Sequence, residues 1–134
     1  MDDLPPFELG YPGTELRQTL IAAVLDGRKT ATSSLRIEYS PHTEERLPAP
    51  GDRSRLAGVD GEPLDVVIET TDVQMARAGD VDLDFARDEG EGFESVADWW
   101  SAHDRFWTSH GVIEKLTEDV LVVCERFRVV EPLP

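Results

Sequence analysis

The segment Gly27-Arg28-Lys29-Thr30 places a cation and a hydroxyl together directly after a predicted helix, and it has some features of a phosphate-binding loop. A P-loop requires Gly-Lys-Thr in direct succession, an earlier glycine, and a strand before the loop with a helix after it. Ala22 stands in place of that earlier glycine, and here the helix precedes the loop. The sequence therefore does not support hydrolysis of a nucleoside triphosphate.

Histidine and cysteine give no indication of a metal centre. The three histidines, His42, His103 and His110, are dispersed, without the regular spacing typical of metal ligands. Cys124 is the single cysteine and lies in an apolar run, so it forms neither an internal disulfide nor a Cys-x-x-Cys site. We expect no metal, no cofactor and a reducing, cytoplasmic location.

The charge balance restricts the possible partners. The 134-residue chain carries 28 Asp and Glu against 13 Lys and Arg, a net charge of -15. Proteins that bind a nucleic-acid backbone normally present a basic face, whereas the cations here occur as isolated pairs such as Arg53 and Arg55. A nucleic-acid ligand must then be small or held locally. No apolar run approaches the roughly 18 residues needed to span a bilayer, so we expect no membrane association.

The first half of the chain is predicted to contain one helix and one extended segment. Residues 1–12 are rich in acids and proline and are expected to form a surface arm, ahead of a single domain over residues 13–134. Apolar residues at helical spacing predict a helix over 14–26, which Gly27 would end. Residues 29–35 read as an extended segment, and the following prolines predict an irregular excursion.

The second half is predicted to form a hairpin, two helices and a final strand. The hairpin comprises residues 53–58 and 63–71 around an Asp-Gly turn. A short helix is expected near Phe85, and a Ser-x-x-Asp capping box predicts a second helix over 96–109. Residues 119–130 read as strand. This mixture predicts the α+β class with a largely antiparallel sheet.

Three blocks of sequence, taken together, resemble the ASCH domain family. They are Gly27-Arg28-Lys29-Thr30-Ala31-Thr32, Val67-Ile68-Glu69-Thr70-Thr71, and Glu89-Gly90-Glu91-Gly92 followed by Trp99, His103 and Phe106. The resemblance extends from about Gly10 to the final strand. It implies a PUA-like fold, a small β-barrel flanked by helices with a cleft beside the barrel, and a role with RNA or modified nucleosides.

The resemblance also implies a set of site residues. Some small members of the family are amidohydrolases that deacetylate N4-acetylcytidine with a lysine, a threonine and a glutamate, which correspond to Lys29, Thr32 and Glu91 here. Glu89 is the alternative acid, two residues away. The residues expected to contact the substrate are Arg28, Thr30, Glu69 and His103.

Two chemistries are open to this set. A neutral Lys29 could take the proton of the Thr32 hydroxyl as that oxygen attacks an amide carbonyl. Alternatively, a charged Lys29 would stabilise the oxyanion while Glu91 or Glu69 activates water or orients the hydroxyl. Without the resemblance, the same residues are typical of a helix-terminal cation, solvated loop acids and, for His103, a packed helix residue.

Three hypotheses for function follow. The first is a hydrolase of an acylated or otherwise modified nucleoside amide. The second is a ribonuclease that cleaves single-stranded RNA in the same cleft, which predicts a basic track beside it. The third is a non-catalytic module that binds RNA or a nucleotide. The expected partner is thus a small nucleoside or a short RNA, and the sequence does not predict the oligomeric state.

Overall fold

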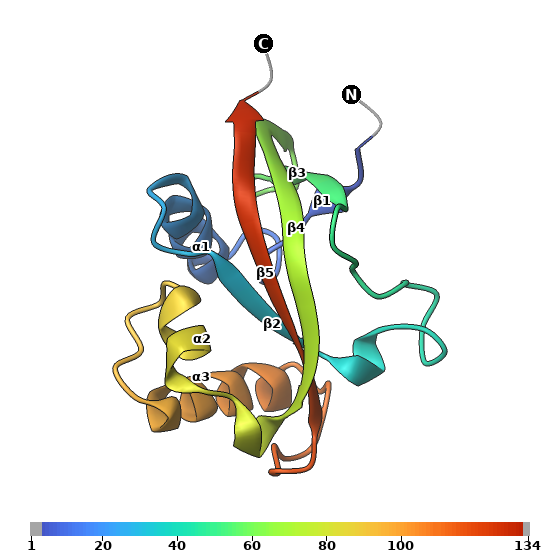
Figure 1. Ribbon diagram of the computed structural model, residues 1–134, viewed down its shortest axis with the longest axis vertical. Coiled ribbons are helices and arrows are strands. Elements are labelled where there is room, and N and C mark those ends of the chain that lie inside the picture. Colours follow the sequence, from blue (N-terminus) through green and yellow to red (C-terminus); the bar gives the residue numbers. More distant parts are fainter. Residues whose placement is uncertain (1–3, 133–134) are drawn as a thin grey trace.

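Five strands form one mixed sheet that curls into a half-barrel (Figure 1). The computed structural model describes residues 4–132. In sheet order, the strands are β1 (Pro6–Phe7), β3 (Arg53–Ala57), β4 (Pro63–Arg77), β5 (Leu121–Pro132) and β2 (Ala31–Leu35). The β1–β3 pair is parallel and the other pairs are antiparallel. The α+β, PUA-like fold expected from the sequence is therefore confirmed.

Strands β4 and β5 form the long central ribbon of the sheet (Figure 1). The predicted hairpin is present, but β4 continues beyond the expected Thr71 to Arg77. It does so because β5 offers a partner along the whole length, down to the pairing of Arg77 with Leu121. The register of the pairing shifts between Thr70 and Asp72, as at a β-bulge.

Three α-helices within the described residues pack against this sheet: α1 (Glu15–Leu25), α2 (Leu83–Asp88) and α3 (Val96–Ser109). Single 3₁₀ turns follow β2 at Arg36–Glu38 and β4 at Ala78–Asp80. As expected, the Ser95 side chain caps α3 by accepting the backbone N–H of Asp98. None of these helices is both long enough and apolar enough to cross a bilayer.

The core is divided between two apolar clusters. One joins α2 and α3 to β2 and β5, with Phe85, Trp99 and Trp107 among its largest members. The other joins α1 to the opposite end of the sheet, through residues such as Ile21 and Phe127. Figure 1 shows the same division, with α1 beside one part of the ribbon and α2 and α3 grouped at another.

The expectation that residues 1–12 form a surface arm is wrong for part of that segment. Phe7 and Leu9 are buried, and Pro6–Phe7 pair with β3 as strand β1. The buried Arg17 of α1 holds this segment in place by donating to the carbonyl oxygens of Gly10 and Gly58. Residues 1–3 lie outside the described part of the chain.

Candidate functional site

Lys29 is positioned by the way helix α1 ends. Gly27 follows the helix with a φ of +85°, a left-handed conformation that only glycine adopts without steric cost. The backbone N–H groups of Arg28 and Lys29 both donate to the carbonyl oxygen of Ala23, at 3.0 Å each. This turn directs the chain into β2 and leaves the Lys29 side chain only 1% exposed.

The loop after α2 brings two acids to Lys29, and Gly90 makes the close approach of this loop to the Lys29 backbone possible. Gly90 has a φ of +70°, and a Cβ atom built on it would lie 2.6 Å from backbone atoms of Arg28 and Lys29. Glycine is thus required both by the backbone conformation and by the close approach of the two chain segments. Because Glu89 and Glu91 flank this glycine, the contact places both of them around Lys29.

The Lys29 amino group lies between two carboxylates. Its Nζ is 3.8 Å from Oε1 of Glu89 and 3.8 Å from Oε2 of Glu91. It also donates to the carbonyl oxygens of Ala31 at 2.9 Å and of Glu89 at 3.2 Å. Carbonyl oxygens only accept, and neighbouring carboxylates favour a positive charge, so these surroundings suit an ammonium group with one N–H left over.

Glu89 connects Lys29 to helix α3. Its Oε2 accepts hydrogen bonds from Ser33 Oγ, at 2.9 Å, and from the Trp99 indole N–H. Its Oε1 lies 3.3 Å from Nε2 of His103, whose Nδ1 lies 2.8 Å from the carbonyl oxygen of Trp99. Both ring nitrogens of His103 therefore face acceptors, which favours the doubly protonated imidazolium. We call Lys29, Ser33, Glu89, Glu91 and His103 the Lys29 cluster.

The two acids of this cluster differ electrostatically. Burial alone would raise the pKa of Glu89, but the charges of His103 and Lys29 outweigh it and hold that pKa below its ordinary value. The same partnership raises the pKa of His103 despite its burial. Burial raises the pKa of Glu91, and Lys29 opposes this only in part. With a side chain 21% exposed, Glu91 is the acid that a ligand can reach.

Thr32 lies in β2 opposite Glu125 of β5. Directly opposed residues on antiparallel strands share a face of the sheet. The Thr70 hydroxyl donates to Glu125 Oε2 at 2.7 Å. On the same strand as Thr32, Ser34 Oγ is 2.7 Å from the Tyr39 hydroxyl. We call Ser34, Tyr39, Thr70 and Glu125 the Glu125 cluster; burial raises the pKa of Glu125, and that of Tyr39 to about 12.

Both clusters line one cavity of about 860 Å³. It lies where the half-barrel is open, because residues 5–8, around edge strand β1, and residues 32–34 of the other edge strand, β2, both line it. Residues 105–107 of α3 contribute a further wall. The volume is in the range of pockets that hold a small organic molecule. Lys29, Thr32, Glu91 and His103, all predicted from sequence, border this cavity together with Glu89.

Two predicted residues, Arg28 and Thr30, do not border the cavity. The Arg28 guanidinium is exposed and binds the Asp26 carboxylate. The Thr30 hydroxyl is 3.4 Å from the carbonyl oxygen of Asp88, and its backbone N–H donates to the same oxygen at 2.8 Å. Thr30 therefore helps to fasten α2 beside Lys29 and does not face the site.

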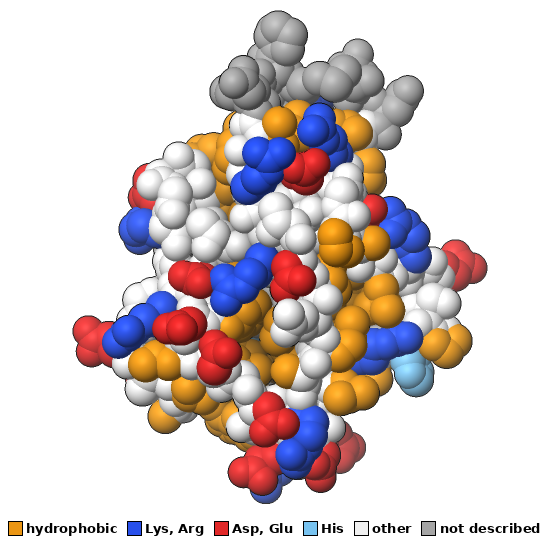
Figure 2. Space-filling model, viewed as in Figure 1, with side chains coloured by type: hydrophobic (Ala, Val, Ile, Leu, Met, Phe, Trp, Pro, Cys, Tyr) orange, Lys and Arg blue, Asp and Glu red, His pale blue; other side chains and the backbone are white. Residues whose placement is uncertain are grey.

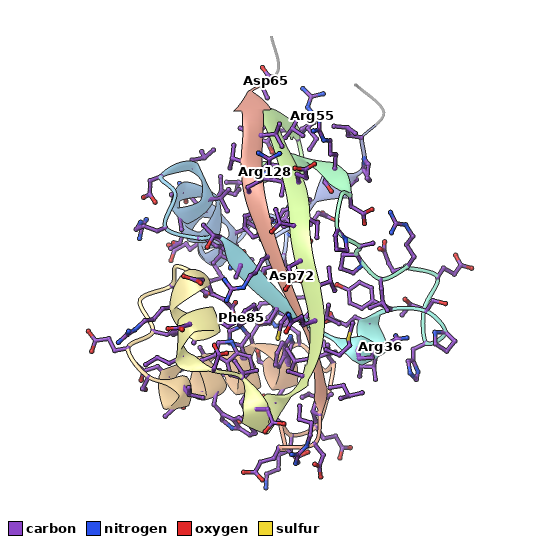
Figure 3. All side chains as sticks on the ribbon, in the orientation of Figure 1. Arg36, Arg55, Asp65, Asp72, Phe85 and Arg128 are labelled. Atoms are coloured by element: carbon purple, nitrogen blue, oxygen red, sulfur yellow. The ribbon has the colours of Figure 1, made fainter. Side chains whose placement is uncertain are left out.

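Glu69 also lies elsewhere. Its carboxylate accepts a hydrogen bond from Arg128 at 2.7 Å and lies 3.5 Å from the Arg53 guanidinium. In Figure 3, Arg128 lies towards the end of the ribbon marked by Arg55 and Asp65, whereas Phe85 marks α2. Glu69 does not border the cavity, because its position in β4 directs its side chain to Arg53 and Arg128.

Sequence reasoning missed Ser33 and Glu125. Ser33 lies at two-residue spacing from the buried Ala31 and Leu35, so its side chain lies on the same face of β2 as theirs. Glu125 likewise stands between Val123 and Phe127 at two-residue spacing, and both of these are buried. An acid at an inward position of a strand was therefore visible in the sequence.

Glu89, Glu91 and His103 each offer one possible metal-ligand atom, and these atoms lie within 4.8 Å of one another. A cation held there would meet the Lys29 amino group, which is 3.8 Å from both carboxylates. The two nitrogens of His103 already face the Trp99 carbonyl and Glu89. The positive charge that these acids require is thus supplied by the chain itself, and the donor set fits a metal poorly.

Comparison with known families identifies the domain. The family model for the ASCH domain matches residues 8–131. The chain belongs to the ASCH domain family. Among solved structures, the ASCH domain from Lactobacillus crispatus is 31% identical, with a TM-score of 0.80 over 93% of this chain and 78% of that one. Protein EF3133 from Enterococcus faecalis is 30% identical, with a TM-score of 0.82 over 96% and 77%. Comparison with curated proteins gave no significant match.

Proposed function

We propose that this ASCH domain is a small hydrolase that cleaves the amide of an acylated nucleoside such as N4-acetylcytidine, with Lys29, Thr32 and Glu91 as catalytic residues. The observation that carries the proposal is the buried Lys29 amino group, held 3.8 Å from each of two carboxylates at the wall of a cavity. Thr32 borders the same cavity. A fixed cation, a reachable acid and a hydroxyl are the groups that acyl transfer requires.

Lys29 acts as a cation in this proposal. Two of its N–H groups are bound to the carbonyl oxygens of Ala31 and Glu89. The third is free to donate to the carbonyl oxygen of the substrate. As that oxygen gains negative charge, the fixed ammonium stabilises it without reorganising. This favours the second of the two chemistries considered from sequence over a neutral lysine that acts as a base.

Glu91 moves the proton. Its carboxylate takes a proton from a water molecule as the water oxygen bonds to the amide carbon. The resulting tetrahedral species then breaks its C–N bond, and Glu91 returns the proton to the departing nitrogen. The products are the free amine of the nucleoside and a carboxylic acid. The raised pKa of Glu91, caused by burial, suits this double role because a carboxyl group with an ordinary pKa is a poor acid near neutral pH.

Thr32 and Glu89 have different tasks. Thr32 borders the cavity, and no described side chain donates to or accepts from its hydroxyl, so that hydroxyl is available to bind the substrate beside Lys29. Glu89 is buried and surrounded by four partners: Lys29, Ser33, Trp99 and His103. It is a positioning residue, because its carboxylate oxygens are engaged by these partners and so fix the cation and the imidazole.

The charges around the cavity favour a small neutral substrate over RNA. Seven Asp or Glu side chains line it against three Lys or Arg, and one of the three, Arg46, is paired with Asp52. The ribonuclease hypothesis predicts a basic track near the cleft. On the face shown in Figure 2, Lys and Arg side chains are interspersed with Asp and Glu. A phosphate backbone would meet mostly like charge.

The test is to incubate the protein with N4-acetylcytidine and follow the release of cytidine. We expect turnover by the unaltered chain and a loss of about 10²–10⁴-fold in kcat for Glu91→Gln, the size of a lost general acid–base group. Lys29→Ala should also abolish turnover. Arg28→Ala and Glu69→Gln are the matched controls, since they remove like charges outside the cavity, and both should retain full activity.

A short single-stranded RNA tested in parallel separates the other hypotheses. Cleavage of the RNA, lost in Lys29→Ala, would replace the proposal with a ribonuclease. Binding of either ligand without turnover would leave a recognition module. Circular dichroism of each variant distinguishes loss of chemistry from loss of fold.

A further inference from the structure

Glu125 is a buried acid for which the proposed chemistry has no use. Glu125 is only 7% exposed, yet it borders the cavity. Thr70 occupies its Oε2, and none of the ion pairs among residues 4–132 includes it. Burying a carboxylate without a cation costs free energy, and burial accordingly raises its pKa. Because Glu125 also borders the cavity, it is a candidate ligand-binding group.

The surroundings of Glu125 indicate the kind of ligand. Its neighbours in the Glu125 cluster are hydroxyl groups, and Thr32 stands directly opposite it in the sheet. The Glu125 Oε1 accepts no hydrogen bond from a described residue. The cluster therefore offers a free carboxylate acceptor beside hydroxyls that both donate and accept. Neutral hydroxyl groups on adjacent carbons complement that arrangement.

We infer that Glu125 binds the sugar hydroxyl groups of an unphosphorylated nucleoside and so determines which part of the substrate the cavity recognises. The inference deepens the proposed function and rests on it for the placement of the base near Lys29. Thr32 and Glu125 face each other across β2 and β5, so a ligand that reaches Thr32 with its reacting group has the Glu125 cluster next to it.

The same residue explains why a phosphorylated ligand should be excluded. Glu125 has no cation to neutralise it, and Asp52 lies close enough to raise its pKa further. A nucleotide phosphate brought to this wall would meet uncompensated negative charge. A sugar hydroxyl instead gives the carboxylate a hydrogen bond.

The experiment measures how strongly the sugar hydroxyls contribute to binding, with and without Glu125. Dissociation constants for cytidine and for its dideoxy analogue, which lacks both ring hydroxyls, are determined by NMR titration. For the unaltered chain we expect the analogue to bind about tenfold more weakly. Glu125→Gln removes the charged acceptor: its single carbonyl oxygen is already used by Thr70, and its amide N–H groups can only donate to the sugar hydroxyls. The difference between the two ligands should therefore fall well below tenfold. Glu45→Gln removes an exposed charge from the same cavity and should keep the tenfold difference.

The outcomes separate this inference from the proposed function. If Glu125→Gln retains the full difference between the ligands, or if cytidine does not bind at all, the inference is overturned. If the difference falls but N4-acetylcytidine is not hydrolysed, the inference stands and the proposed function fails. If Glu125→Gln folds poorly, Thr70→Val is the second variant to test. It removes the hydroxyl that orients the Glu125 carboxylate and should reduce the difference in dissociation constant between cytidine and its dideoxy analogue.

Discussion

Two groups of glutamates and cations illustrate how burial changes the meaning of the same residue types. Around Lys29, Glu89 contacts the Lys29 amino group and the His103 imidazole, and its side chain is 1% exposed. At the far part of the sheet, Glu69 contacts Arg53 and Arg128, both of which are at least half exposed. Each glutamate has a lowered pKa: hydrogen bonding from Arg128 lowers that of Glu69, and His103 and Lys29 lower that of Glu89 against burial.

The two groups differ in whether water can solvate a charged side chain whose ion-pair partner has been removed. Water reaches the arginines around Glu69 and can solvate any of the three side chains, so their pairing adds little to stability. Water has no comparable access to Glu89, and removing one of its cations leaves a charge buried without compensation. The Lys29 cluster is thus a rigid electrostatic unit, and the Glu69 group is a surface ion pair.

Removing the shared cation should have the largest effect. Lys29→Met keeps most of the side-chain volume but leaves the Glu89 and Glu91 carboxylates without it. We expect a loss of about 3–5 kcal/mol in the free energy of unfolding, as for breaking a buried ion pair. Chemical denaturation of the variant and the unaltered chain measures the change. An unchanged free energy of unfolding would show that the cluster is solvated in the same way as Glu69.

The close approach at Gly90 should have the next largest effect. A methyl group there meets the backbone of Arg28 and Lys29 at 2.6 Å, so Gly90→Ala has to separate α2 from the Lys29 turn. Gly92→Ala is the matched control: its φ is +83°, but a Cβ atom there meets nothing within 4 Å. We expect Gly90→Ala to be less stable than Gly92→Ala by about 1–3 kcal/mol. Equal melting temperatures for the two variants would contradict the required contact.

The pH dependence of stability tests the pairing of His103 with Glu89. The folded pKa of His103 is raised above its ordinary 6.5, so the stabilisation is complete below pH 6.5 and is lost as the pH rises through the folded pKa. The melting temperature should fall over that interval. His103→Gln should flatten this dependence, and an unchanged slope in the variant would assign the fall to another group.

The smallest effect is expected at the surface group. Glu69→Gln leaves two arginines that water can solvate, and it should change neither the melting temperature nor the turnover of N4-acetylcytidine measurably. Thermal denaturation alongside the activity assay checks both. A clear loss in either would remove the distinction between the two groups.

Local patterns predicted most of the elements but not all of the contacts between them. The sequence predicted α1, α3 and the left-handed conformation of Gly27 from apolar spacing and capping residues, which act within a few residues of the chain. Strand β1 was missed because two residues pair with a strand that begins at Arg53. Phe7 and Leu9, apolar at two-residue spacing, were the indication of burial in that segment.

The site could be predicted only in part for a related reason. Lys29 and Thr32 were found from their motif, and the structure brings Lys29, Glu89 and Glu91 together. Glu125 was missed and Glu69 lies away from the cavity, because which face of a strand carries an acid depends on register. Alternation with Val123 and Phe127 would have placed Glu125 inward, whereas the sequence around Glu69 does not reveal Arg128 as its partner.

The opening in the half-barrel has a consequence for how a ligand would affect the molecule. Residues of β1 and β2, the two margins of the sheet, face each other across the cavity and share no strand pairing. A bound small molecule would contact both edge strands and so link them where no strand pairing does. The two-residue strand β1 would be stabilised most by this contact. Backbone amide exchange at Phe7 should therefore slow when a ligand fills the cavity, although Phe7 is distant from Lys29 in the sequence.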